Sequence, residues 1–159
     1  MAGSNCVFCG IVANDEKKQI IFQDDTLVVF SDIRPAAKHH YLIVTKEHIS
    51  DCKVLTPEQK PLVELMVSKA NEILTEHNGS TENSRLGFHW PPFHTIGHLH
   101  LHAIAPVGEM GFVARMIFRE NSWWFVSPEY VLARLSNEKK SPQEEQAPEK
   151  ENPSNPPAE

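Results

Sequence analysis

The chain has 159 residues, of which 40% are hydrophobic and 23% charged, and its formal net charge is −6 at pH 7. This length favours one domain with a buried core. The negative charge and the lack of any basic run argue against a protein that mainly binds a nucleic-acid backbone, because phosphate binding depends on clustered Lys and Arg. No apolar stretch approaches the roughly 18 residues of a membrane span, and the first residues lack a signal-peptide pattern. We therefore expect an intracellular protein with neither nucleic-acid nor membrane partners, and the three cysteines, two of them in a CxxC, fit a reducing compartment.

In chain order, the first half predicts three strands and a helix. Two apolar runs in QIIFQDDTLVVFSDI, separated by Asp24-Asp25, predict a hairpin, and HHYLIVT predicts a third strand. The segment Thr56-Pro57-Glu58-Gln59 resembles a capping box. Apolar residues at helical spacing then predict a helix that ends at Asn78-Gly79, with regular geometry starting only at Pro61.

The second half predicts two more strands and a helical extension. A strand over 85–88 precedes the Pro91-Pro92 break and the histidine-rich strand GHLHLHAIAP. MGFVARMIF has helical character, and NSWWFVS predicts a short aromatic strand or hook. Ser127-Pro128-Glu129 then caps a last helix that runs through Leu135. This order of elements predicts an α+β domain over residues 1–135 with one mostly antiparallel sheet.

The last segment, residues 136–159, has a different composition. It contains five prolines, six glutamates and three lysines, and no apolar residue larger than alanine. Such a segment cannot bury enough surface to offset the entropy lost on ordering. We therefore expect a disordered, acidic, proline-rich tail.

Three histidines alternate with apolar residues in HLHLHAI. In a strand, His98, His100 and His102 would share one face, with an apolar ridge on the other. The outer two would lie roughly 13 Å apart, so one zinc ion could take two neighbouring rings but hardly all three. A solvated polar face is the simpler explanation. The apolar residues between them indicate a central strand, however, where three imidazoles need a function.

HLHLHAI resembles the motif of the histidine triad (HIT) family. The resemblance extends to CVFCGI, DIRPAAKHHYLIVTKEHI, GFHWPPF, GHLHLHAIAPV and NSWWFV, which together are similar to one nucleotide-binding branch of that family. It implies a HIT-like α+β fold with a five-stranded, mostly antiparallel sheet, a main helix and a C-terminal helical extension. It also implies a homodimer or higher homo-oligomer and a cytoplasmic location, with the nucleus as a second compartment.

The activity that the resemblance implies is hydrolysis of adenosine 5'-phosphoramidates and acyl-adenylates to AMP through a covalent nucleotidyl-histidine. His100 matches the nucleophile, and imidazole is largely unprotonated near pH 7. His102 matches the residue that contacts the phosphate and assists proton delivery. His40 would line the phosphate site while His39 points to the other side of the strand, and Thr95 would hydrogen-bond near the leaving group.

The resemblance also implies a nucleoside site. Asp32 would accept the ribose hydroxyls and Ile33 would pack on the base. Further apolar residues would complete the slot, although a core role explains each of them equally well: Phe8, Ile11, Phe30 and Leu42. His89 falls near the position where many family members carry an Asn. The segment directly before the triad, RLGFHWPPFHTIGH, contains no Gln, so the leaving-group contacts differ from the family pattern.

Related proteins with a CxxC at this place bind zinc. The corresponding ligands are Cys6, Cys9, His48 and His98, a set suited to a closed tetrahedral structural site. No coordination position would stay open, so we expect no catalytic metal. Cys52 is then a free thiol.

Several alternatives remain open from the sequence. The same motif occurs in dinucleoside polyphosphate hydrolases and nucleotidyl transferases. A zinc hydrolase could hold a catalytic metal on His98 and His100, or on His100 and His102. A nucleotide-binding regulatory protein with weak turnover is a further class. His94 has no assigned role.

Overall fold

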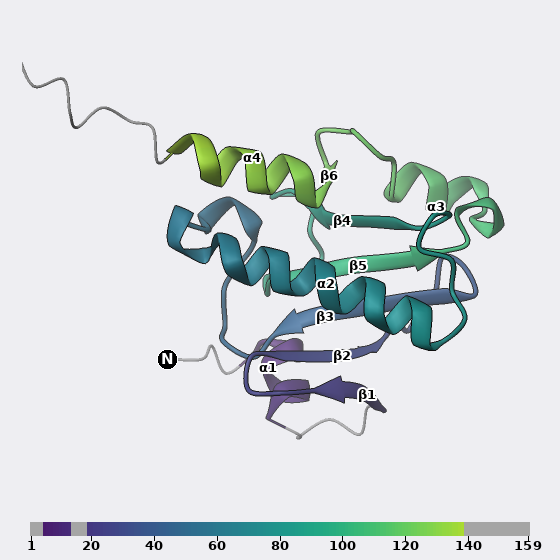
Figure 1. The fold of residues 1–159 in the computed structure, drawn as a ribbon, viewed down its shortest axis with the longest axis horizontal. Helices are drawn as coiled ribbons and strands as arrows, with labels where there is room; N and C mark the ends of the chain where they lie inside the picture. Colours follow the sequence, from purple (N-terminus) through teal and green to yellow (C-terminus); the bar gives the residue numbers. More distant parts are fainter. Residues whose placement is uncertain (1–4, 14–18, 139–159) are drawn as a thin grey trace, which may run out of the picture.

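The computed structural model describes residues 5–13 and 19–138. Six strands form one sheet in the order β1-β2-β3-β5-β4-β6, and neighbouring strands are antiparallel (Figure 1). The strands are β1 (Ile20–Gln23), β2 (Leu27–Ser31), β3 (His39–Thr45), β4 (Arg85–His89), β5 (His100–Ala105) and β6 (Phe125–Val126). The α+β class and the antiparallel sheet are confirmed. The expected number of five strands is wrong by one, because NSWWFVS adds a two-residue strand at the edge of the sheet.

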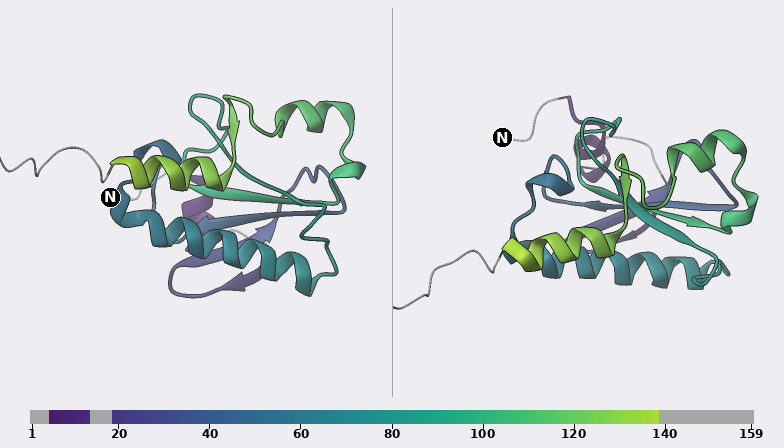
Figure 2. Two further views of the ribbon diagram at one scale, coloured as in Figure 1. Left: turned by 45° about the horizontal axis from the view of Figure 1, so that its top comes forward. Right: turned by 90° about the horizontal axis from the view of Figure 1, so that it is seen from above.

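Helices lie on both faces of the sheet. They are α1 (Val7–Val12), α2 (Lys60–Glu76), α3 (Phe112–Ile117) and α4 (Pro128–Glu138), with short 3-10 turns at Cys52–Val54, Pro57–Gln59 and Val107–Glu109. Helices α2 and α4 cover one face, and α1 lies on the opposite face (Figure 2). None of the helices in the described part of the chain is long and apolar enough to cross a membrane.

The main helix begins and ends close to the predicted positions. The Thr56 N–H donates to Gln59 Oε1 at 2.9 Å, and α2 begins at Lys60, one residue before Pro61. A proline in the first turn is tolerated because its missing N–H would have no partner within the helix. At the other end Asn78 has a φ of 59°, in the left-handed region that stops a helix.

The central strands are buried on both faces. Along β3, Tyr41 and Ile43 pack into the core under α2, whereas Leu42 and Val44 pack into a second cluster under α1. Every residue of β5 is also buried, and β5 lies between β3 and β4. The prediction of a central histidine strand is therefore confirmed, although the strand begins at His100, so His98 lies just before it.

The last helix is longer than predicted. Ser127 caps it as expected, because its Oγ accepts the Tyr130 N–H at 3.2 Å. The helix continues past Leu135 to Glu138, where Arg134 Nη1 and Glu138 Oε1 form an ion pair of 2.6 Å one turn apart. The rest of the expected tail, residues 139–159, lies outside the described residues.

Candidate active site

The pairing of β3 with β5 brings His40, His100 and His102 to one face. Leu42 lies opposite His102, and Val44 lies opposite His100. His40 Nε2 and His102 Nδ1 are 3.0 Å apart, and the His100 and His102 ring centroids are 4.9 Å apart. All three imidazoles are buried, and they face the side of the sheet that carries α1.

Backbone groups fix the direction of a hydrogen-bond chain through these rings. The Ala36 N–H donates to His40 Nδ1 at 3.0 Å, so the proton of a neutral His40 is on Nε2 and points to His102 Nδ1. His102 Nε2–H then donates to His89 Nδ1 at 3.2 Å. His89 Nε2–H donates to the Ile117 carbonyl at 3.3 Å. Each ring donates once and accepts once, so all three rings can stay neutral.

His100 is oriented separately. Its Nδ1–H donates to the His98 carbonyl at 2.6 Å, which leaves the Nε2 lone pair free. Burial lowers the pKa of His100 to about 4, an effect that the His98 hydrogen bond only partly opposes. Burial likewise lowers the pKa of His40 to about 4, and it holds the pKa of His102 well below the ordinary value. At neutral pH, His100 is therefore an unprotonated imidazole whose hydrogen bond to the His98 carbonyl fixes its tautomer.

Asp32 reaches the same group of imidazoles from the end of β2. Its Oδ2 lies 3.5 Å from His40 Nε2, and its Oδ1 accepts the Arg34 N–H at 2.8 Å. The side chain of Ile33 next to it is 78% exposed. The Ile33 side chain is therefore accessible from solvent next to the Asp32 carboxylate.

The remaining residues predicted for the nucleoside lie in two different places. Four of them, together with Val28 and Val44, form the buried cluster under α1: Phe8, Ile11, Phe30 and Leu42. Thr95 lies in the loop before β5, is exposed, and forms no side-chain hydrogen bond within residues 5–13 and 19–138. The structure thus does not join Thr95 to the histidines, and its role stays a prediction.

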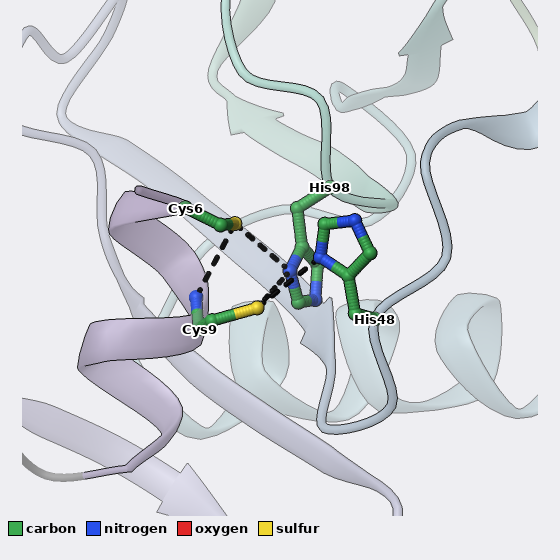
Figure 3. Close-up of side chains that lie close together, drawn as sticks. All are labelled: Cys6, Cys9, His48 and His98. Carbon is green, nitrogen blue, oxygen red and sulfur yellow. Dashed lines mark hydrogen bonds between the residues drawn. The ribbon is translucent and has the colours of Figure 1, made fainter. Parts of the chain in front are cut away.

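The four predicted metal ligands meet at the other end of the histidine segment (Figure 3). Cys6 Sγ is 3.4 Å from His98 Nδ1, and Cys9 Sγ is 3.1 Å from His48 Nδ1 and 3.5 Å from His98 Nδ1. All four donor atoms lie within 4.8 Å of one another. His98 Nε2–H donates to the Thr45 carbonyl at 2.7 Å, which leaves Nδ1 unprotonated and aimed at the thiols. This donor set fits a tetrahedral zinc ion.

Asp32, His40 and His102 also place donor atoms within 4.8 Å of one another, but they fit a metal poorly. A neutral His40 that bound a metal through Nε2 would carry its proton on Nδ1. That proton would point at the Ala36 N–H, which already donates to Nδ1. The hydrogen bonds of this cluster therefore favour a metal-free site, in contrast to the cysteine-containing cluster.

Comparisons with known proteins agree with this geometry. A family model described as "Scavenger mRNA decapping enzyme C-term binding" (DcpS_C) matches residues 5–117. Adenosine 5'-monophosphoramidase HINT3 of Mus musculus is 47% identical over 83% of this chain and 82% of the relative, and HINT3 of Xenopus tropicalis is 44% identical over 82% of this chain and 87% of the relative. A HIT family hydrolase from Clostridium thermocellum superposes with a TM-score of 0.60 at 29% identity, covering 64% of this chain and 90% of that chain. The chain belongs to the histidine triad family.

Within this histidine triad protein the two histidines of β3 have different environments. His40 belongs to the triad face, whereas His39 Nδ1 lies 3.0 Å from the Tyr41 hydroxyl on the α2 face. The Tyr41 ring in turn contacts the His77 ring, with centroids 5.4 Å apart. Only His40 of the two therefore lies on the face that carries the triad, as the alternation of side chains along a strand requires.

Some features of the triad site were missed from the sequence. Phe118 and Phe125 contact both His89 and His102, with ring centroids 5.0–6.1 Å apart. The aromatic content of NSWWFV was a signal for Phe125, but Phe118 had none. His94 lines a small cavity together with His89 and His100, and its Nδ1 is buried without a hydrogen-bond partner among the described residues.

Proposed function

We propose that this histidine triad protein hydrolyses adenosine 5'-phosphoramidates and acyl-adenylates to AMP through a covalent nucleotidyl-histidine. One observation carries the proposal: His100 is neutral, and its Nδ1–H is held by the His98 carbonyl at 2.6 Å, so Nε2 is free to attack phosphorus. The HINT3 relatives named as adenosine 5'-monophosphoramidases support the substrate class.

In the first step, His100 Nε2 forms a bond to the α-phosphorus while the bond from phosphorus to the leaving group breaks; the leaving atom is nitrogen in a phosphoramidate and a carboxylate oxygen in an acyl-adenylate. The leaving nitrogen must take up a proton, because an amide anion is a poor leaving group. The negative charge of a bound phosphate would favour a proton on His102, and His102, which lies beside His100, would donate that proton to the leaving nitrogen. Water then attacks the phosphorus, the bond from phosphorus to His100 Nε2 breaks, AMP leaves, and the proton that water loses would pass to His102.

The nucleoside would lie along Asp32 and Ile33. The free edge of the Asp32 carboxylate would accept the ribose hydroxyls, and the exposed Ile33 side chain would cover the base. The cluster under α1 would provide the apolar floor of this slot, with His89 and Thr95 on the side of the leaving group.

We propose that Cys6, Cys9, His48 and His98 bind one structural zinc ion. The metal would link α1 to the segment before β5, and no open position would remain for catalysis. Freshly purified protein should contain about one zinc per chain, measured by elemental analysis. The double substitution Cys6→Ser with Cys9→Ser should lower both the zinc content and Tm, and wild-type protein without zinc would refute this site.

The proposed chemistry is tested by His100→Ala. We expect this variant to lose hydrolysis of an adenosine phosphoramidate while it keeps AMP binding and its circular dichroism spectrum. Wild-type turnover in the variant would refute the covalent mechanism. Normal AMP affinity with negligible turnover in the wild-type protein would instead indicate a nucleotide-binding regulatory protein.

The preferred substrate is tested by comparing kcat/KM for three compounds: an adenosine phosphoramidate, an acyl-adenylate and a diadenosine polyphosphate. We expect the first two to be preferred. A preference for the diadenosine compound would indicate a dinucleoside polyphosphate hydrolase. We further propose a homodimer located in the cytoplasm and nucleus, to be tested by light scattering and cell fractionation.

A further inference from the structure

One residue faces both the candidate metal centre and the nucleophile. The imidazole of His98 points its Nδ1 at the two thiols, 3.4 Å from Cys6 Sγ and 3.5 Å from Cys9 Sγ. The backbone carbonyl of the same residue accepts the His100 Nδ1–H at 2.6 Å. Any movement of His98 therefore reaches the nucleophile through a single hydrogen bond.

A second contact leads from the metal centre to His100. Phe8 lies between the two cysteines on α1, and its ring packs edge-on against His100 with centroids 5.1 Å apart. The same ring lies 5.9 Å from that of His98. Helix α1 has only six residues, too few to be stable by itself, so its position depends on packing and on whatever its cysteines bind.

We infer that the Cys6–Cys9–His48–His98 centre positions the nucleophile, with His98 acting on His100 through its backbone carbonyl. This inference rests on the zinc site proposed above. With zinc bound, His98 is fixed by its ligand bond on Nδ1 and by Thr45 on Nε2. Without the metal only the Thr45 bond and side-chain packing hold it.

The effect should fall on the chemical step. When Nε2 of His100 bonds to phosphorus, the ring gains positive charge, and its Nδ1–H becomes a stronger donor to the His98 carbonyl. The hydrogen bond thus stabilises the transition state more than the bound substrate. Loss of the metal should lower kcat and leave KM nearly unchanged.

His48 offers a test that changes neither the nucleophile nor His98. It is an exposed residue, and its Nδ1 contacts Cys9 Sγ at 3.1 Å. His48→Ala removes one ligand, whereas His48→Cys supplies a thiolate and makes a Cys3His site, which is also common for structural zinc. Cys52→Ser is the matched control, because Cys52 is a buried thiol outside this centre.

For His48→Ala we expect loss of zinc, a fall of roughly tenfold or more in kcat on an adenosine phosphoramidate, and a KM within about twofold of wild type, as expected for one lost hydrogen bond. Imidazole ¹⁵N NMR should show His100 as a mixture of tautomers instead of Nδ1–H alone. His48→Cys should restore zinc, kcat and the single tautomer, and Cys52→Ser should match wild type in all three.

Wild-type protein purified without zinc refutes the metal centre itself. Zinc in wild type, combined with unchanged kcat and an unchanged His100 tautomer in zinc-free His48→Ala, overturns the positioning role and leaves both proposed functions standing. If His48→Ala does not fold, chelator-stripped wild type that retains its circular dichroism spectrum takes its place in the same comparison. If kcat falls in this folded, chelator-stripped protein and added zinc does not restore it, the inference is also overturned.

Discussion

The buried histidines make the stability of the protein depend on pH. In the unfolded chain these rings bind protons below about pH 6.5. In the folded protein burial holds the pKa of His40 and His100 at about 4, so both rings stay neutral between pH 6.5 and pH 4. The unfolded state binds more protons in this window, and stability must fall as pH falls. We expect the free energy of unfolding to be roughly 3 kcal/mol lower at pH 5.5 than at pH 7.5, measured by urea denaturation.

Two variants separate this effect from general acid sensitivity. His100→Asn removes one of the buried titrating rings and should reduce the pH dependence. Thr95→Ala removes an exposed side chain that does not titrate and should leave the dependence as in wild type. Equal stability of the wild-type protein at the two pH values would contradict the burial argument.

For individual residues, the side chains of the site could be predicted from the sequence, but their backbone hydrogen-bond partners could not. The alternation in HLHLH predicted three imidazoles on one face. The resemblance to the histidine triad family grouped His40 with them and the two thiols with His48 and His98, and both clusters form in the structure. The histidine rings are also held by hydrogen bonds to backbone carbonyls, those of His98, Thr45 and Ile117. Every residue has such a carbonyl, so only the path of the loops decides which of them meets a ring.

At the scale of secondary-structure elements, strand β4 pairs with two different strands, β5 and β6. It pairs with β5 as far as Gly87, opposite His102, and then pairs with β6 from Phe88 onward. A Cβ at Gly87 would collide with the Phe125 ring. That ring packs against His89 and so lies next to the hydrogen-bond chain. The small size of Gly87 is therefore what lets β6 approach the site.

We predict that Gly87→Ala lowers the free energy of unfolding by about 1–3 kcal/mol, as overpacking does elsewhere. It should also lower kcat, because a displaced Phe125 disturbs His89. Thermal and urea denaturation measure the first effect, and steady-state kinetics the second. Gly108→Ala is the matched control, since a Cβ there meets nothing within 4 Å. Equal losses in both variants would show that the crowding at Phe125 is not the cause.

The residues at which helices and strands begin and end were harder to predict than the type of each element. The sixth strand consists of only Phe125–Val126, too short for a periodic pattern, and it pairs with the edge of β4 that faces away from β5. The extra turn of α4 depends on an ion pair between side chains four residues apart. Such boundaries are set by tertiary contacts, which the local sequence does not reveal.

At the scale of the whole molecule, α4 closes one face of the core. Its Val131 and Leu135 side chains are completely buried, and Arg134 Nη2 donates to the carbonyls of Cys52 and Leu55 at 3.0 and 3.1 Å. Each buried aliphatic side chain contributes roughly 1.5–3 kcal/mol. The helix thus supplies a large share of a typical domain's net stability.

We predict that a chain ending after Glu138 keeps the Tm and the kcat/KM of the full chain, because the composition of residues 139–159 offers little apolar surface to bury. A chain ending after Val126, which lacks α4, should lose its cooperative thermal transition. Calorimetry and steady-state kinetics on both chains check these outcomes. A folded, active chain without α4 would contradict the prediction and show that the sheet and α2 are enough for folding and activity.

The hydrogen-bond chain through His40, His102 and His89 has one further consequence, for proton conduction. A proton that hopped along it would reverse the tautomer of every ring and turn the His40 N–H against the N–H of Ala36. Neither the Ala36 amide nor the Ile117 carbonyl at the far end can exchange its role. The chain therefore favours one set of tautomers and is unsuited to conducting protons from one end to the other, so a proton that His102 gives up has to return to His102 itself and not by way of His40 or His89.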